Sequence, residues 1–525
     1  MATTSPAPES PGRRTTLIRF LDVVERIGNA LPDAVTLFVL FAVLVVAASA
    51  IAAAAGVSAI HPANGSTIEV VNLLSGEGIR RMLTEAVRNF AGFPPLGLVI
   101  VVVIGIAVAE RSGLVATALK SLVASVPPSL LTATLVFAGI MSSMAVDAGY
   151  VVLTPLGAMV FAAVGRHPLA GLAAAFAGVS AGFSANLLLT SLDPLLSGLS
   201  TEAARLVNAD YVVDPTANYY FMIASVFMLT LVGTFVTNRF VEPRFAKWDP
   251  SEGAPEAATG LTIGESGPAE RKGLAAAGIV FLVSMAVFAL LVVPEGAPLR
   301  NPEAAGEPVL VQIRPFFDSI VTLLMVLFLA MGLAYGIAAG TIRSDRDVAR
   351  MSAEGVAVLG SYIVLAFAAA QFIAYFNWSK LGLIIAIKGA GGLKAAGFDG
   401  IPLLIGFIAV AAMINLFIGS ASAKWALMAP VFVPMLMLMG YSPETVQAAY
   451  RVGDSTTNVI TPLMQYFPVI LAFALKYNRK AGIGTLISAM LPYSVFFFIA
   501  WVLMFSVWIT FDLPLGPGAP LRYLP

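Results

Sequence analysis

The stretch AAYRVGDSTTNVITP, residues 448–462, carries an arginine, an aspartate and five Ser, Thr or Asn side chains directly after a long apolar run. The planar guanidinium of Arg451 suits a carboxylate, whereas Asp454, beside hydroxyl and amide oxygens, suits a hard cation. An ionised side chain at bilayer depth costs roughly 2.5–3.5 kcal/mol on insertion scales. The run therefore indicates a solvated site, although a salt bridge between these two residues, three apart on one helical face, would also neutralise both charges.

A second polar run, GVSAGFSANLLLTSLDP, occupies residues 178–194. Ser, Thr and Asn side chains compete with helical backbone bonds, and glycines lower helix propensity, so both runs predict helices that unwind locally. Unwound carbonyls and hydroxyls suit cations, and the N-termini of half-helices favour anions. Asp193, which precedes Pro194, is predicted either at such an interruption or as a surface cap.

Two apolar blocks, 128–165 and 400–440, have a small polar break at their centres and are about twice the roughly 20 residues that one crossing needs. They predict two re-entrant helical hairpins with tips near 142–149 and 419–424. Non-helical backbone at membrane depth is tolerated where it meets protein or a water-filled cavity. The two tips therefore predict the position of a cavity.

Several residues near the tips have a structural interpretation beside a functional one. Asp147 is a candidate structural ligand of backbone amides in the first tip, and Lys424 is expected to extend its ammonium group toward the membrane surface. Trp425 is either a packing anchor or a flat wall for an aromatic ring. Asn415 either belongs to the site or joins the two hairpin legs by a hydrogen bond.

The composition, 58% hydrophobic and 11% charged, exceeds the apolar content that a soluble core requires. The chain is therefore predicted to be an all-α polytopic membrane protein embedded in the lipid bilayer. Windows of about 20 apolar residues, the length that crosses a bilayer core of roughly 30 Å, predict nine transmembrane helices near 32–56, 94–110, 168–193, 218–240, 273–293, 316–342, 353–376, 444–475 and 481–511.

An offset of 275 residues brings similar positions of the two halves together, among them Gly178 with Gly453 and Tyr150 with Trp425. Short amphipathic stretches, 112–125 and 380–397, precede the two hairpins. Five spans separate the hairpins, and an odd number places them on opposite sides of the membrane. The pattern indicates an inverted-topology repeat with a midplane site, which is typical of secondary transporters.

The distribution of Lys and Arg sets the expected orientation. Basic residues concentrate in 1–31, 238–247, 343–350 and 476–480, which places the N-terminus in the cytoplasm and the C-terminus outside, with 57–92 among the outside segments. The first 31 residues form a polar tail without the features of a signal peptide. Four regions follow: a tail, 1–31; a first transmembrane half, 32–247; a cytoplasmic linker, 248–272; and a second transmembrane half, 273–525.

Other classes of function find little support. A formal net charge of zero offers no basic surface for nucleic acid. The chain has no cysteine and two histidines, which disfavours zinc or thiol chemistry, and His167 is expected in a cytoplasmic turn. The Walker A pattern that would bind ATP is absent from the sequence.

The sequence resembles the AbgT family of p-aminobenzoyl-glutamate transporters over essentially its whole length. The resemblance lies in SSMAVDAGYVVLTPLGAMVF and SANLLLTSLDP in the first half, and in NLFIGSASAKWALMAP and YSPETVQAAYRVGDSTTNVITP in the second. It implies a homodimeric transporter of the bacterial inner membrane with nine spans, two hairpins and elevator-like motion. Its implied substrate is p-aminobenzoyl-glutamate, a folate breakdown product, and some members export sulfonamide antimetabolites.

The resemblance also implies roles for individual residues. It assigns substrate contacts to Asp193, Trp425, Pro443 and Arg451, with the tip residues Ser420 and Ser422 as further members of the site. It assigns a cation site to Asn415 and Asp454, which leaves open whether Na⁺ binds there or a carboxylate carries a proton. No other cofactor is expected.

We therefore expect an ion-coupled secondary transporter and not an enzyme. One alternative is an intramembrane amidohydrolase that uses Asp193 and Asp454 as an aspartyl pair. A channel is the other alternative, and it predicts uptake that neither saturates nor runs against a gradient.

Overall fold

The computed structural model describes residues 32, 34–60, 65–144, 149–245, 248, 267–304, 309–461, 464 and 466–524. Within these residues the chain is predominantly helical, as predicted, with one small antiparallel sheet of β1 (Ser58–Ile60) and β2 (Thr67–Glu69). The predicted tail, most of the predicted linker and the candidate Asp147 lie outside the described residues.

The first half of the chain contains helices that differ widely in length. Its α-helices are α2 (Ala34–Ala54), α3 (Gly76–Ala91), α4 (Pro94–Arg111), α5 (Leu114–Ala124), α6 (Leu131–Met141), α8 (Thr154–Ala163), α9 (Pro168–Phe176), α10 (Leu192–Ala204) and α11 (Tyr219–Val236). Short 3₁₀ or π turns extend them at η1 (Ser142–Met144), η2 (Gly149–Leu153), η3 (Ala177–Ala181), η4 (Thr237–Val241) and η5 (Glu242–Arg244).

The second half also combines long and short helices. Its elements are α13 (Pro268–Val292), η7 (Pro302–Ala304), α14 (Val309–Gln312), α15 (Arg314–Asp318), α16 (Ile320–Ala339), α17 (Asp345–Val358), α18 (Gly360–Trp378), α19 (Leu381–Ala395), α20 (Gly400–Asn415), α21 (Ala421–Met437), α22 (Pro443–Thr456), α23 (Phe467–Tyr477) and α24 (Ile483–Thr510).

Six helical segments of the described chain are long and apolar enough to cross a membrane, and α17 with α18, bent by 46°, would make a seventh. Their exposed side chains are largely apolar, as lipid contact requires. The six segments are Val35–Ala54, Gly76–Arg111, Tyr219–Arg244, Pro268–Val292, Ile320–Ala339 and Ile483–Thr510. The structure thus confirms a membrane protein of many apolar helices.

The two remaining predicted spans are interrupted helices. The window 168–193 contains α9 and η3, then non-helical backbone over 182–191, and ends at the start of α10. The window 444–475 contains α22, a non-helical segment that begins at Thr457, and α23. The prediction of unwinding is wrong for 451–456, which stays helical to Thr456. In this last turn the Thr456 hydroxyl donates to the carbonyl of Val452, which is compatible with helix.

Each predicted hairpin block consists of two short helices, α6 with α8 and α20 with α21. The second tip is shifted from its predicted position, because non-helical backbone spans 416–420 and α21 already begins at Ala421. Ser420 is the N-cap of α21, since its hydroxyl accepts from the backbone N–H of Ala423 at 3.3 Å. Lys424 and Trp425 consequently lie in the helix and not in the tip.

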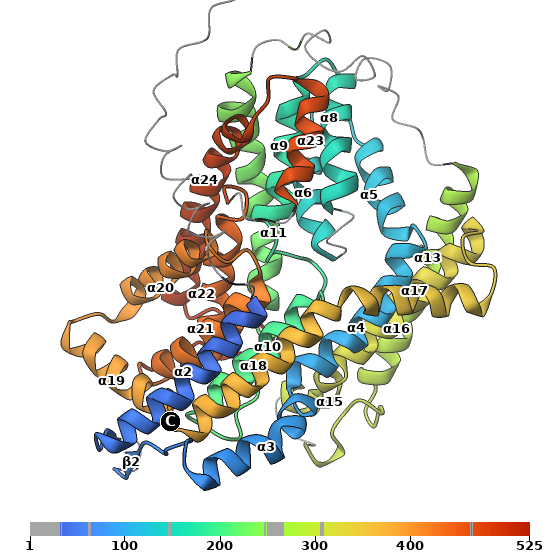
Figure 1. Cartoon of the computed structure of the whole chain (residues 1–525). Helices are drawn as coiled ribbons and strands as arrows, with labels where there is room; N and C mark the ends of the chain where they lie inside the picture. The colour runs from blue at the N-terminus through green and yellow to red at the C-terminus, as the bar shows by residue number, and fades with distance from the viewer. Residues whose placement is uncertain are drawn as a thin grey trace, which may run out of the picture.

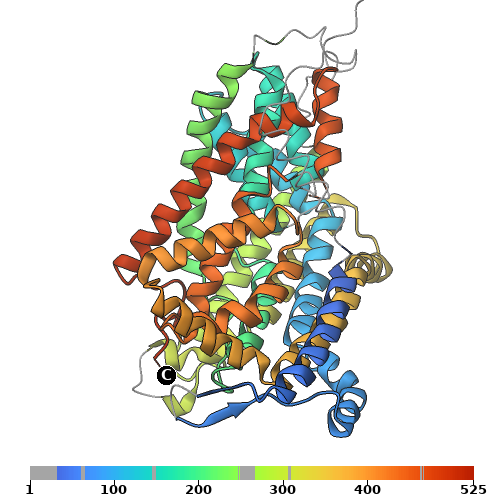
Figure 2. The same cartoon turned by 60° about the vertical axis from the view of Figure 1, so that its left-hand side comes forward.

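The two halves interleave around the interrupted helices (Figure 1). Helix α10, from the first half, packs against α21 and α22 of the second, and α23, from the second half, packs against α8 and α9 of the first. Both views place α8, α9 and α23 at one end of the molecule, and the C-terminus and the sheet at the other (Figure 2). This exchange brings residues more than 200 positions apart together.

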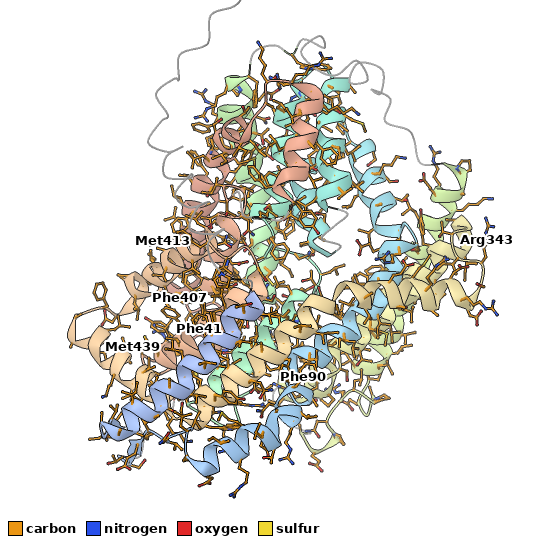
Figure 3. The ribbon with its side chains drawn as sticks, in the orientation of Figure 1. Phe41, Phe90, Arg343, Phe407, Met413 and Met439 are labelled. Atoms are coloured by element: carbon orange, nitrogen blue, oxygen red, sulfur yellow. The ribbon has the colours of Figure 1, made fainter. Side chains whose placement is uncertain are left out.

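Aromatic contacts fasten the outer helices to this centre. Phe90 of α3, labelled in Figure 3, packs edge-on against Phe367 of α18 with ring centroids 5.6 Å apart. Phe41 of α2, also labelled, lies 5.9 Å from Phe372 of α18. Arg343, in the turn between α16 and α17, lies by contrast at the edge of the molecule in the same view.

Candidate functional site

The two interruptions meet at the centre of the fold. The backbone N–H of Ser184 donates to the hydroxyl of Ser455 at 3.2 Å, and the side-chain amide of Asn458 donates to the carbonyl of Ser180 at 3.2 Å. The sequence predicted that both polar runs would line one site. These two bonds between them confirm that the runs are neighbours.

A cavity of about 570 Å³ opens beside this crossing. Its volume falls within the range of roughly 300–1,000 Å³ that small-molecule sites occupy. Aromatic residues and hydroxyl or acidic groups share the lining, which consists of Val99, Ser143, Tyr150, Phe183, Ser191, Leu192, Leu195, Leu359, Tyr362, Gly419, Ser420, Ala421, Ser422, Asp454, Asn458, Met464 and Tyr466. The prediction that the second hairpin tip borders a cavity is confirmed.

Arg451 pairs with Asp193 and not with Asp454. Its Nη2 lies 2.5 Å from Oδ1 of Asp193, and Nη1 contacts the sulfur of Met222 at 3.2 Å. The other oxygen of Asp193 accepts from the backbone N–H and the hydroxyl of Thr190 at 2.6 and 3.0 Å. Asp193 is completely buried, so its interpretation as a surface cap is wrong, as is the internal Arg451–Asp454 bridge.

Asp454 instead pairs with Lys424. Nζ of Lys424 lies 2.5 Å from Oδ1 of Asp454 and also donates to the side-chain oxygen of Asn415. Lys424 is completely buried, so the expectation that it extends toward the membrane surface is wrong. The reason is the early start of α21, which turns this side chain toward α22. Oδ2 of Asp454 has no hydrogen-bond partner among the described residues.

Asn415 connects the second hairpin to the interrupted helix, as one of its two interpretations predicted. Its Nδ2 donates to the carbonyl of Asp454 at 2.5 Å, the hydroxyl of Thr457 at 2.8 Å and the side-chain oxygen of Asn458 at 2.8 Å. Its single oxygen is occupied by Lys424. In this arrangement Asn415 and Asp454, the two residues expected to hold Na⁺, do not fit a sodium ion between them, because the ammonium group of Lys424 already contacts one oxygen of each residue there.

Of the other predicted substrate residues, some line the cavity and others are buried behind it. Ser420 and Ser422 line the cavity, and their hydroxyls lie 3.2 Å apart. Trp425 is completely buried behind it, where it stacks on Tyr450 with ring centroids 4.3 Å apart. Pro443 is the buried first residue of α22, two helical turns before Arg451, and is not among the lining residues.

Two tyrosines were missed by the sequence interpretation. The hydroxyl of Tyr450 donates to the carbonyl of Ala421 at 2.6 Å and also lies 3.2 Å from Oδ1 of Asp454. Tyr150 stacks on Tyr466 with centroids 4.3 Å apart, and both line the cavity. Helical spacing could have identified Tyr450, which precedes Asp454 by one turn. The 275-residue offset pairs Tyr150 with Trp425, so an aromatic stack follows both hairpin tips.

His167 takes no part in this site. His61 lies outside the described residues, and His167 caps the N-terminus of α9, where its Nδ1 accepts from the backbone N–H of Leu169 at 3.2 Å. Burial lowers the pKa of His167 to about 4, so the ring is neutral at pH 7 and can keep this acceptor role. Within the described residues no three acidic, histidine or cysteine side chains cluster as a metal site.

Comparisons with known proteins agree with one another. A model of the family described as "AbgT putative transporter family" matches residues 19–523. The p-aminobenzoyl-glutamate transport protein of Escherichia coli (strain K12) is 39% identical over 495 residues, which cover 94% of this chain and 95% of that protein.

Two solved structures share the fold. The YdaH transporter of Alcanivorax borkumensis superposes with a TM-score of 0.87 at 45% identity, covering 93% of this chain and 100% of that one. MtrF of Neisseria gonorrhoeae, described with a class of antimetabolite efflux pumps, superposes with a TM-score of 0.90 at 49% identity, covering 96% and 100%. These relatives are transporters and efflux pumps, which confirms the prediction that the protein is not an enzyme and gives the amidohydrolase alternative no support. The chain belongs to the AbgT family of transporters.

Proposed function

We propose that this protein is an ion-coupled secondary transporter of p-aminobenzoyl-glutamate and related aromatic amino-acid conjugates, and that it also exports sulfonamide-type antimetabolites. The observation that carries the proposal is the cavity beside two buried charge pairs, where the two halves of the chain cross. The substrate classes follow from the relatives, one a p-aminobenzoyl-glutamate transport protein and one associated with antimetabolite efflux.

The lining suits an aromatic ring with a carboxylate tail. The stacked Tyr150 and Tyr466 offer an aromatic wall, against which a ring packs favourably. Ser420 and Ser422 stand at the N-terminus of α21, where hydroxyls and the positive end of the helix favour a carboxylate. We assign direct substrate contact in this state to the two serines.

The remaining substrate residues stand one layer behind the cavity. Trp425 and Arg451 are buried and bonded to protein partners, so substrate reaches them once these contacts rearrange. Arg451 retains one unused donor, since its Nε has no partner among the described residues. We therefore propose that Asp193, Arg451, Trp425 and Pro443 shape the site in this state and complete it in another.

We propose the full architecture of nine spans and two re-entrant hairpins, related as an inverted repeat. A Cβ atom on Gly178 would lie 2.4 Å from the carbonyl oxygen of Val136 in α6, and one on Gly453 would lie 2.6 Å from that of Ile408 in α20. Both glycines, 275 residues apart, thus allow an interrupted helix to touch the first leg of a hairpin. This repeated contact supports common descent of the halves.

We also propose an elevator-like motion and a homodimeric assembly. An elevator-like movement would carry the hairpins and interrupted helices as one body, and the homodimer would hold the outer helices in place. The protein would lie in the bacterial inner membrane with its N-terminus in the cytoplasm and its C-terminus outside. The C-terminus shares one end of the molecule with β1, β2 and α3, which belong to a segment predicted outside (Figures 1 and 2).

Counterflow in proteoliposomes tests the proposal. Purified protein should exchange labelled p-aminobenzoyl-glutamate saturably, and a gradient of sodium ions or protons, imposed separately, should drive accumulation of the unchanged compound. Release of free p-aminobenzoate in detergent would reveal an amidohydrolase. Uptake that neither saturates nor proceeds uphill under either gradient would reveal a channel, and either result would refute the proposal.

A further inference from the structure

Lys424 is the most deeply buried cation beside the cavity. Its side chain is 0% exposed, and the Asp454 carboxylate that it contacts is 2% exposed. Its Nζ also lies 5.8 Å from the centre of the Tyr450 ring, within reach of a cation–π interaction. An acidic oxygen, an amide oxygen and an aromatic face thus surround one ammonium group.

This surrounding resembles the coordination of a small monovalent cation. Carboxylate and amide oxygens are the usual ligands of hard cations, and here both point at Nζ. The Asn415 side chain cannot turn its amide nitrogen toward a cation without losing its three donor contacts to the interrupted helix. The amide oxygen is therefore fixed toward the position that Nζ occupies.

The position of Nζ is set by the helix that carries it. Lys424 lies in the first turn of α21, whose start is fixed by the Ser420 cap and by the bond from Tyr450 to the carbonyl of Ala421. The tip of the second hairpin and the charge on Nζ therefore move together. Movement of this end of α21 away from α22 would withdraw the ammonium group from Asp454.

We propose that Lys424 is a tethered cation that occupies the position expected for a coupling cation and excludes sodium from Asn415 and Asp454 while α21 stays against α22. The inference rests on the proposed ion-coupled transport, which it makes more specific: in this state the second hairpin brings its own positive charge to Asp454. Lys424 acts here as a residue that determines cation specificity.

Removing the ammonium group should create a sodium site. In Lys424→Met the carboxylate of Asp454 would face the vacated position, with one oxygen released by the lysine and Oδ2 already without a partner among the described residues. The oxygen of Asn415 would face the same position. Three protein oxygens, two from Asp454 and one from Asn415, together with cavity water, would then be available to ligate Na⁺.

The test measures binding of labelled sodium to the full-length protein in detergent, with choline replacing sodium at constant ionic strength. Wild type should show no saturable binding. Lys424→Met should show saturable binding, at least tenfold above the non-saturable background of wild type, and should gain thermal stability when sodium is added. Lys388→Met, which removes an exposed lysine from α19, should behave as wild type, and Lys424→Met with Asp454→Asn should lose the gained binding.

Equal saturable binding by wild type and Lys424→Met would overturn the inference, as would a folded Lys424→Met that binds no sodium. Lys424→Gln provides a second variant if the methionine variant elutes as an aggregate, and the same two outcomes apply to it. Sodium binding is measured without transport, and substrate counterflow by wild type is a separate experiment. Failure of this inference can therefore be distinguished from failure of the proposed function.

Discussion

The two buried charge pairs on α22 neutralise their charges in different ways. Both oxygens of Asp193 are bonded, one to Arg451 and one to Thr190, and neither Asp193 nor Arg451 is among the residues that line the cavity. Asp454 lines the cavity, and its Oδ2 has no partner within the described chain. One carboxylate is thus fully engaged, and the other has capacity for a further ligand.

The partners of the two pairs also come from different parts of the chain. Asp193 belongs to α10 of the first half, so its bridge to Arg451 fastens the two halves together. Lys424 belongs to the second hairpin, which precedes α22 in the same half. The first pair is therefore suited to hold the architecture, and the second is suited to change during transport.

Arg451→Met should cause the largest loss of stability. It leaves the buried Asp193 carboxylate without its cation, and removing one partner of a buried pair costs about 3–5 kcal/mol. The measurement is the thermal midpoint of unfolding in detergent. Arg451→Lys, which keeps the charge, should lose less, and Arg451→Met combined with Asp193→Leu should recover most of the loss. A single variant as stable as wild type would show that this pair does not fasten the halves.

Asp454→Asn should destabilise the protein less than Arg451→Met does, but it should abolish the dependence of uptake on the ion gradient. The amide oxygen can still accept from Lys424, so we expect a loss of about 1.5–3 kcal/mol, as for a hydrogen bond to a charged group. Uptake in proteoliposomes should no longer respond to the imposed gradient. If uptake by Asp454→Asn still follows the gradient as in wild type, the coupling site lies elsewhere. Asp193→Asn is the control, and it should mainly reduce stability.

The sequence predicted the interrupted helices well because their signals are local. The polar runs extend into the segments that unwind, 182–191 and the stretch that begins at Thr457, although Gly178 and Gly453 themselves stay in helical turns. The partners of the charges were not predictable in the same way. Arg451 and Asp193 are 258 positions apart, and nothing in the helical spacing favours this pair over Arg451 with Asp454.

The position of Lys424 shows how a small error in a boundary changes an interpretation. A tip at 419–424 leaves this lysine in a loop from which it can reach water. A tip that ends at Ser420 places it one turn inside α21, facing Asp454. Ser420 is a favoured N-cap residue, and its hydroxyl bonds the backbone N–H three residues later. Capping preference was therefore the signal that could have set this boundary.

Trp425→Phe should have a smaller effect, and it tests whether the layer behind the cavity contacts substrate. The indole Nε1 donates to the hydroxyl of Ser200 at 3.0 Å, and its loss should cost about 1 kcal/mol of unfolding free energy. Trp501→Phe is the matched control, since the Nε1 of Trp501 donates to Ser225 at 2.7 Å. Both should lose similar stability. If Trp425 also contacts substrate, the KM for uptake should rise in Trp425→Phe alone.

Ser422→Ala should have the smallest effect on stability and a visible effect on uptake. Its hydroxyl lines the cavity and has one bond, 3.2 Å to Ser420, so unfolding should change by no more than about 0.5 kcal/mol. A hydrogen bond to substrate of about 1 kcal/mol would raise the KM for p-aminobenzoyl-glutamate about fivefold. Ser125→Ala, which removes an exposed hydroxyl next to α5, should leave the KM unchanged. An unchanged KM in Ser422→Ala would show that substrate does not lie between the Asp454 carboxylate and the second hairpin tip. The unpartnered oxygen that distinguishes Asp454 from Asp193 would then have another role than substrate binding.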